Sequence, residues 1–165
     1  MIHAQFLGLD QLDRVKRAGI LPSFFVAHVL HWGEIHIRNL GLQRASKMSP
    51  LRSALERNMH FTLHQDSPVI LPDMLETIYC AVSRKTETGR ILGEDERIDA
   101  CSALRAVTAE AAYQYFEENE TGTLSEGKRE NLIILSENPV GCSEEKLREI
   151  RVEETIRDGE TVFKL

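Results

Sequence analysis

The sequence predicts an α/β fold, and two observations lead to that prediction. Short apolar segments alternate with helical segments through the first half of the chain, which is the order of βα units. The nearly continuous apolar run Ile20–Val26 is typical of a strand buried on both faces, as in a parallel sheet. A chain of 165 residues, 42% hydrophobic and 28% charged, has the composition of an ordinary globular domain.

Periodicity and turn residues define the elements expected in the first half. Asp10 suits the N-cap of the first helix and Gly19 its end, while Pro50 and Pro72 suit the first turns of two later helices. In chain order, the expected elements are a helix over Asp10–Ala18, a strand over Ile20–Val26, a helix over Pro50–Asn58, a strand over His60–Leu63 and a helix over Asp73–Ser83.

The second half of the chain has a different pattern of residues. Polar residues and two glycines over Arg84–Arg97 predict an exposed loop, and the alanine-rich segment Ile98–Phe116 predicts one long amphipathic helix. Leu132–Leu135 and Val162–Phe163 are short strand candidates, with turns at Glu126–Gly127 and Asp158–Gly159. Asp-Gly is a strong hairpin signal.

Composition and charge exclude several classes of partner. The net charge is −6, the sequence pI is about 5.5 and there is no basic block, which argues against nucleic-acid binding. No apolar run approaches the roughly 20 residues of a membrane span, and no export signal is visible. Cys80, Cys101 and Cys142 form no CxxC pair and are expected to be buried thiols, so we expect a cytoplasmic protein.

The histidines are the most informative residues for chemistry. Asp66 ends the strand His60–Leu63, and His28 follows the strand Ile20–Val26 in the same way. Imidazole and carboxylate together suit a zinc site, and the carboxyl ends of barrel strands face the active site. The histidines are His3, His28, His31, His36, His60 and His64.

Simpler interpretations compete with a catalytic one. Asp66 before Ser-Pro is a common turn starter, and His60 suits the surface. His31 and His36 lack helical ligand spacing, so a polar loop packed under Trp32 explains them. His64 alternates with Asp66, so both can point the same way, and His64 either binds substrate or caps a loop.

Several segments, taken in order, resemble the C-terminal part of amidohydrolase-superfamily enzymes of the family 3 type. The resemblance covers essentially the whole chain, and the segments are individually modest but specific together. They are Ile2–Gln5, Leu21–Phe24 with His28, Thr62–Pro68, Leu92–Ile98, Ala103–Thr108, Ala111–Tyr113, Gly122–Lys128 and Asn131–Leu135.

The resemblance implies the last three βα units of a distorted TIM barrel, strands six to eight. A long helix and part of a small β-sandwich follow. Residues 1–118 would form the C-terminal portion of the barrel, and residues 119–165 part of a composite β-sandwich domain. The implied activity is metal-dependent hydrolysis of carbon–nitrogen bonds other than peptide bonds, in a small amide or imide-like substrate.

The resemblance also assigns roles to residues. His3 matches the strand-six histidine that binds the metal, and Asp66 matches the strand-eight aspartate that is both metal ligand and general base. His28 matches a histidine that touches substrate, and we expect His64 to bind substrate as well. The implied cofactor is a divalent cation, zinc by the nature of its ligands.

The chain departs from the family pattern in its metal ligands. The strand-one His-x-His pair, the strand-four bridging residue and the strand-five histidine have no counterpart, and the usual Ala-Asp before the sandwich strand is Glu130–Asn131. We therefore expect hydrolysis only when the missing part of the barrel is supplied. The alternative is a catalytically inactive fragment or interaction module that forms a homo-oligomer, or joins a complementary barrel segment, through exposed strands. A cupin-like metal protein is disfavoured because Ile20–Val26 does not alternate.

Overall fold

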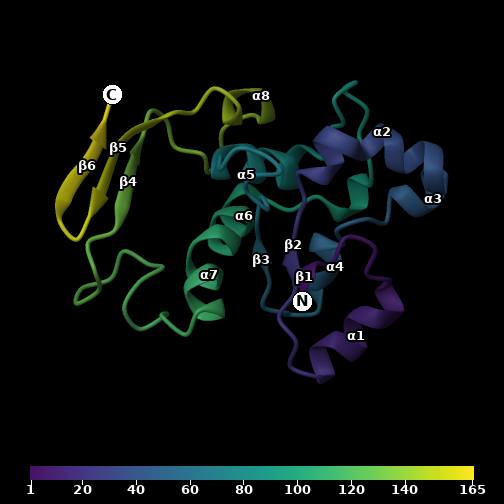
Figure 1. Cartoon of the computed structure of the whole chain (residues 1–165), viewed down its shortest axis with the longest axis horizontal. Helices are drawn as coiled ribbons and strands as arrows, with labels where there is room; N and C mark the ends of the chain where they lie inside the picture. Colours follow the sequence, from purple (N-terminus) through teal and green to yellow (C-terminus); the bar gives the residue numbers. More distant parts are fainter.

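The computed structural model describes residues 1–165 and contains two separate three-stranded sheets. The first is parallel, with strand order β1-β2-β3, and the second is antiparallel, with order β4-β5-β6. Figure 1 shows the parallel sheet inside a helical body and the antiparallel sheet at the C-terminal side. The strands are β1 (Ile2–His3), β2 (Ser23–Phe24), β3 (Thr62–Leu63), β4 (Leu132–Leu135), β5 (Val152–Arg157) and β6 (Glu160–Lys164).

Helices connect and cover the parallel strands (Figure 1). They are α1 (Leu9–Arg17), α2 (His28–Leu40), α3 (Leu42–Ala45), α4 (Leu51–Glu56), α5 (Met74–Ser83), the 3₁₀ turn η1 (Glu94–Glu96), α6 (Ala100–Val107), α7 (Ala109–Gln114) and α8 (Glu144–Leu147). None of these helices combines the length and apolar character needed to cross a lipid bilayer.

The register of the parallel sheet brings three chain segments out at one edge. Ser23 on β2 pairs with Ile2 on one side and Thr62 on the other. Backbone hydrogen bonds continue beyond the strands, from Phe25 N–H to the His3 carbonyl (3.3 Å) and from His64 N–H to the Phe24 carbonyl (3.1 Å). The residues that follow β1 and β3 therefore lie close together at the carboxyl ends of the strands.

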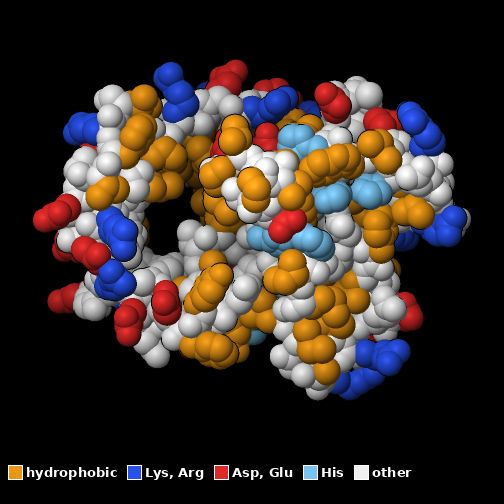
Figure 2. Space-filling view, viewed as in Figure 1, with side chains coloured by type: hydrophobic (Ala, Val, Ile, Leu, Met, Phe, Trp, Pro, Cys, Tyr) orange, Lys and Arg blue, Asp and Glu red, His pale blue; other side chains and the backbone are white.

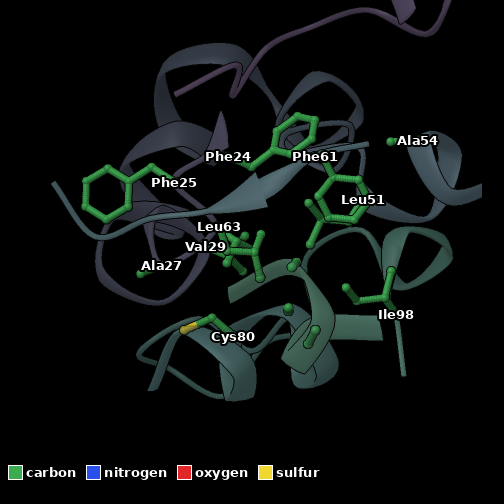
Figure 3. Close-up of a cluster of buried hydrophobic side chains, with 14 of the residues drawn as sticks. Phe24, Phe25, Ala27, Val29, Leu51, Ala54, Phe61, Leu63, Cys80 and Ile98 are labelled. Carbon is green, nitrogen blue, oxygen red and sulfur yellow. The ribbon is translucent and has the colours of Figure 1, made fainter. Parts of the chain in front are cut away.

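The hydrophobic core lies between the parallel sheet and its helices. Phe24 of β2 meets Phe61 edge to face at 5.6 Å between ring centroids, and both side chains belong to the buried cluster drawn in Figure 3. Leu63 of β3 joins Val29 and the α5 residue Cys80 in the same cluster. Burial of such side chains supplies most of the folding free energy.

The first-half elements are largely confirmed, with local differences. The expected strand Ile20–Val26 is ladder-paired only at Ser23–Phe24, because Phe25 and Val26 already turn into α2, where their carbonyls accept from His28 and Val29 N–H. The first helix begins after Gly8, not Asp10; the Gly8 N–H donates to Gln11 Oε1 at 2.8 Å. The helix expected over Asp73–Ser83 begins at Met74, with Asp73 as the N-cap that accepts from the N–H groups of Leu75 and Glu76, so Pro72 precedes the helix and does not lie in its first turn.

Helix α2 corrects the prediction of a polar loop under Trp32. Residues His28–Leu40 form a continuous helix, with Val29 and Gly33 buried against the core. Its N-cap, Ala27, makes no side-chain capping hydrogen bond, so the usual start signal was missing. Packing against the core, and not a local capping signal, therefore stabilises α2 as a helix.

The segment Arg84–Arg97 is not the exposed loop that its polarity predicted. Arg84, Thr86, Leu92 and Glu96 are buried. The Arg84 guanidinium donates to the carbonyls of Leu92 (2.8 Å), Ser49 (3.0 Å) and Met48 (2.7 Å). Polar side chains here satisfy buried backbone groups, which composition alone does not reveal.

The expected long helix over Ile98–Phe116 is broken at Thr108. Its backbone dihedrals are φ −125° and ψ −86°, which separate α6 from α7. The Thr108 hydroxyl donates to the Leu104 carbonyl at 2.7 Å, a local bond of the kind that competes with helix propagation.

The C-terminal segment confirms the Asp158–Gly159 hairpin turn, which joins β5 to β6. Strand β5 and helix α8 carry no signal that the sequence reasoning used. Leu147 of α8 and nearby Ile150 belong to the same core cluster as the parallel-sheet residues. Cys80 is buried and Cys142 half-buried, but Cys101 is exposed, which corrects the expectation of three buried thiols.

Candidate functional site

The candidate site lies where the segments after β1 and β3 meet. His3 is the last residue of β1, and His64 and Asp66 follow β3. Figure 2 shows histidine side chains gathered on one face of the molecule, with an acidic group beside them. Residues 61 positions apart in the chain thus become neighbours through the parallel register.

The three side chains lie close enough to share one ion. His3 Nε2 is 3.6 Å from Asp66 Oδ2, and His3 Nδ1 is 2.9 Å from His64 Nε2. One ligand atom from each of His3, His64 and Asp66 lies within 4.8 Å of the others. We expected His3 and Asp66 to converge on one cation, and this geometry agrees with that expectation. We call the edge of the parallel sheet where His3, His64 and Asp66 meet the rim.

The backbone at this rim adopts uncommon conformations. His3 has φ +65° and Asp66 has φ +53°, in the left-handed region that residues with a Cβ rarely occupy. Such strain costs free energy and concentrates at functional sites. His3 is the last residue of β1 and Asp66 lies three residues beyond β3, and their side chains approach to 3.6 Å.

His64 is tied to the sheet by hydroxyl groups beneath it. Its Nδ1 lies 2.9 Å from Ser23 Oγ, and Ser23 Oγ lies 2.8 Å from Thr62 Oγ1. Ser23 and Thr62 are register partners on β2 and β3 and are both buried. Burial, followed by the nearby His3, lowers the pKa of His64, so its imidazole is neutral near pH 7 and has a lone pair to offer.

His28 lies beside the cluster but is not part of it. Its ring contacts Phe25 edge to face at 4.6 Å between centroids, and the Phe25 ring in turn lies 5.7 Å from the His3 ring. Its Nδ1 is 3.2 Å from His36 Nε2. Burial, then the neighbouring His36, lowers the pKa of His28 to about 4, so this side chain is neutral at pH 7.

Sequence reasoning missed the pairing of His36 with His28. The two residues are eight positions apart, which places them on one face of a helix. That signal required α2 to be recognised first. His31, on the same helix, bonds to Glu76 at 2.9 Å and stays outside the cluster.

His60 lies at the other end of β3, as expected for a surface residue. Its side chain is 57% exposed and bonds to Glu110 at 2.7 Å. His60 and Glu110 therefore form a histidine–carboxylate pair with the same chemistry as His3 and Asp66. No third possible metal ligand lies close to this pair.

The donor set at the rim fits a divalent cation. Imidazole nitrogen and carboxylate oxygen are zinc ligands, and two such ligands at a tetrahedral angle lie roughly 3.4 Å apart. The 3.6 Å between His3 Nε2 and Asp66 Oδ2 matches that spacing. Both side chains are partly exposed, at 41% and 42%, so further ligands and water can reach the same point.

Comparison with known proteins gives this arrangement a family. Residues 1–163 match the Amidohydrolase family. The chain belongs to the amidohydrolase family. The resemblance inferred from the sequence motifs is confirmed over nearly the whole chain.

Two curated relatives are similar to the chain but much longer. N-substituted formamide deformylase of Arthrobacter pascens is 36% identical over 158 residues, covering 95% of the chain and 29% of the relative. Protein LONG AFTER FAR-RED 3 of Arabidopsis thaliana is 35% identical over 140 residues, covering 82% of the chain and 24% of the relative. The chain thus spans less than a third of their length.

Solved structures of metal-dependent hydrolases confirm an α/β fold of the same kind. An uncharacterized metal-dependent hydrolase from Pyrococcus horikoshii OT3 aligns with a TM-score of 0.73 and 25% identity, over 87% of the chain and 30% of that structure. A similar hydrolase from Pyrococcus furiosus aligns with a TM-score of 0.69 and 26% identity, over 84% and 28%. Metal dependence is therefore a property of the family, and the rim of this chain holds a possible metal-binding group.

Proposed function

We propose that this amidohydrolase chain contributes part of the active site of a zinc-dependent hydrolase of non-peptide carbon–nitrogen bonds. The observation that carries the proposal is the convergence of His3 Nε2 and Asp66 Oδ2 at 3.6 Å within a family of metal-dependent hydrolases. His3 and Asp66 would hold the cation.

Asp66 has the position of a general base. A bound zinc ion supplies Lewis-acid polarisation and makes a water molecule acidic near neutral pH. The half-exposed Asp66 carboxylate can accept a proton from the attacking water and pass it to the nitrogen that leaves. The carbon–nitrogen bond then breaks to release an amine and a carboxylate.

His28 and His64 stay predictions as substrate-binding residues. The His28 ring contacts the Phe25 ring, which in turn lies beside the His3 ring. The lowered pKa of His28 keeps its side chain uncharged at pH 7. A neutral imidazole beside aromatic rings suits an uncharged amide or imide-like group better than an anion. One relative, named as a deformylase of N-substituted formamides, supports a small amide as substrate.

We also propose the layout inferred from the motifs. Residues 1–118, with the parallel sheet, would be strands six to eight of a TIM barrel, and residues 119–165, with the antiparallel sheet, part of a composite β-sandwich. The relatives are more than three times longer than the chain, and the remaining ligands would come from the other barrel strands. A cytoplasmic location stays a prediction.

Calorimetric titration with Zn²⁺ tests the cation site. We expect the chain to bind one equivalent, and Asp66→Asn or His3→Gln to weaken binding at least tenfold. His60→Asn is the matched control, because His60 bonds a carboxylate at 2.7 Å on the opposite end of β3 and should leave binding unchanged. Equal weakening by all three variants would contradict the proposed ligands.

A chimaera tests the activity. Residues 1–163 would replace the matching C-terminal segment of the Arthrobacter pascens deformylase, with which they share 36% identity. We expect amine release from an N-substituted formamide by the chimaera, none by the chain alone, and loss of at least 10³-fold with Asp66→Asn. A chimaera that binds zinc but hydrolyses nothing would count against the proposed reaction.

A specific observation favours the alternative of an association module. A cavity of about 790 Å³ lies between α7, the loop to Leu124 and the antiparallel sheet, and Figure 2 shows the opening beside it. Tyr115, Phe116 and Leu124 are 70%, 89% and 87% exposed. We propose that a complementary barrel segment or a second copy covers them. Sedimentation velocity decides, because a monomer that stays monomeric at high concentration excludes the second copy.

A further inference from the structure

Gln65 lies between His64 and Asp66, and its side chain is buried. It is 3% exposed, while His64 is partly exposed and Asp66 is exposed. The Gln65 Nε2 donates to the Asp73 carbonyl. A carbonyl only accepts hydrogen bonds, so the amide nitrogen of Gln65, and not its amide oxygen, must face Asp73. Gln65 therefore ties the segment after β3 to the residue that precedes α5.

Asp73 is itself held firmly at the start of α5. Its Oδ1 caps the helix by accepting from Leu75 N–H at 2.9 Å and from Glu76 N–H at 3.1 Å. Its carbonyl also accepts from Thr77 N–H at 3.2 Å, which is a backbone bond of the helix. Without Gln65, the Asp73 carbonyl would keep a donor and the helix would keep its cap. The bond from Gln65 is therefore dispensable for α5 itself.

Asp66 depends on its neighbours in the chain for its orientation. Its carboxylate has one ionic neighbour, His3, and the 3.6 Å between them exceeds hydrogen-bond distance. On the C-terminal side, Ser67 is exposed, and the Asp66 carbonyl accepts from Val69 N–H at 2.9 Å. On the N-terminal side, the buried Gln65 is the attachment to the body of the protein. Gln65 thus bears directly on the uncommon backbone of Asp66, with its φ of +53°.

A second observation argues against a role for Gln65 in stability alone. The Gln65 Oε1 is buried and has no hydrogen-bond partner. A buried acceptor without a partner costs folding free energy, and an apolar side chain of similar size avoids that cost. Methionine would therefore suit this position at least as well for stability. What glutamine adds is the bond to Asp73.

We propose that Gln65 is a positioning residue: its bond to Asp73 holds the backbone from which Asp66 presents its carboxylate to a cation shared with His3. The inference rests on the proposed metal site. Groups that orient a metal ligand are important for affinity, and their removal typically weakens metal binding roughly 10- to 100-fold. Here the orienting bond acts through the backbone of the ligand.

Titration of the full chain with Co²⁺ tests the proposal. Co²⁺ takes the same ligands as Zn²⁺ and, unlike Zn²⁺, has a visible spectrum that depends on ligand number and geometry. We expect Gln65→Met to bind Co²⁺ at least tenfold more weakly than the wild type, with a spectrum shifted toward that of Asp66→Asn. Its urea midpoint should be no lower than that of the wild type. Wild-type affinity and spectrum in Gln65→Met would overturn the proposal.

Gln5→Met is the matched control. Gln5 lies two residues after His3, and its Nε2 is also buried but has no hydrogen-bond partner, so this substitution removes no tie. We expect its Co²⁺ affinity to stay within twofold of the wild type. Equal weakening in Gln5→Met and Gln65→Met would overturn the proposal.

A second substitution at Gln65 guards against a misfolded variant. Gln65→Asn keeps an amide, but one methylene short of the Asp73 carbonyl, and should weaken Co²⁺ binding as Gln65→Met does. If neither variant folds, Gln65 is a structural residue and the proposal is wrong.

Hydrogen exchange of the metal-free chain separates this proposal from the metal site. Because Val69 N–H bonds to the Asp66 carbonyl, we expect its exchange to quicken at least tenfold in Gln65→Met and to stay unchanged in Gln5→Met. That result in a chain that binds no Co²⁺ would uphold the role of Gln65 and refute the metal site. Unchanged Val69 exchange, with Co²⁺ bound by the wild type, would do the reverse.

Discussion

The site is made by a few residues that leave their strands in uncommon conformations. His3 and Asp66 have positive φ values, and their side chains meet at 3.6 Å. The surrounding sheet must supply the free energy that keeps them there. Nearby, burial lowers the pKa of His36, and burial followed by the neighbouring His36 lowers the pKa of His28.

At the scale of single residues, we predict that His28 makes the free energy of unfolding depend on pH. Its pKa is about 4 in the folded chain against 6.5 for an ordinary histidine, so the unfolded chain binds the extra proton first on acidification. Stability contributed by neutral His28 is complete above pH 6.5 and falls as pH drops toward 4. His36, His3 and His31 oppose the charged form, and Asp66 favours it.

Urea unfolding at pH 7 and pH 4.5 measures the effect. Allowing for partial exposure, we expect His28→Asn to reduce the pH-dependent loss by about 1–2 kcal/mol. His60→Asn, at the exposed end of β3, is the control. An identical pH profile for wild type and His28→Asn would contradict the prediction.

At the scale of the elements, the polar segment after α5 stabilises the fold through a buried side chain. Arg84 has φ +49° and is fully buried, and burial lowers the pKa of its guanidinium to about 10. Its side chain bonds three carbonyls from two segments. The α3–α4 connection is thereby tied to the chain that follows α5.

Replacing Arg84 should therefore be severe. Arg84→Met leaves the Leu92 and Met48 carbonyls without a donor and removes one of the two donors to the Ser49 carbonyl. We expect a loss of about 3–5 kcal/mol in the free energy of unfolding. Arg90→Met is the matched control, because Arg90 is 53% exposed and pairs only with Glu34 at 3.3 Å; it should cost under about 1 kcal/mol. Thermal or urea unfolding compares the two, and similar losses would refute the structural role of Arg84.

Across the whole molecule, helix α8 joins the C-terminal residues to the parallel-sheet body. Glu144 pairs with Lys85 at 3.0 Å and with Arg97 at 3.1 Å. Leu147 is 2% exposed and lies in the shared core. Residues on both sides of the proposed boundary at 118 thus share one buried cluster.

We predict that Leu147→Ala destabilises the entire chain by about 2–4 kcal/mol, since it leaves a cavity in the shared core. Hydrogen exchange should then quicken at β2 and β3 as well as at β4 to β6. Leu124→Ala, at a side chain 87% exposed, is the control and should change little. Faster exchange confined to residues 119–165 would show that the two parts unfold independently.

Prediction from sequence succeeded where local signals were strong. The two helices that follow Pro50 and Pro72 and the Asp158–Gly159 hairpin agree with the structure, and the strand expected over His60–Leu63 is present at Thr62–Leu63. It failed where side chains far apart in the chain decide the outcome. Nothing local marks α2 as a helix or Arg84 as buried.

By itself, the sequence determined the family and the α/β alternation, and it predicted His3 and Asp66 as candidate metal ligands. These results depend on motifs and short-range periodicity. Only the tertiary structure decided that His64 stands between His3 and the Ser23–Thr62 hydroxyls, and that His36 pairs with His28. The physical reason is that strand register and helix phase set which distant side chains meet, and neither is written in the spacing of any one segment.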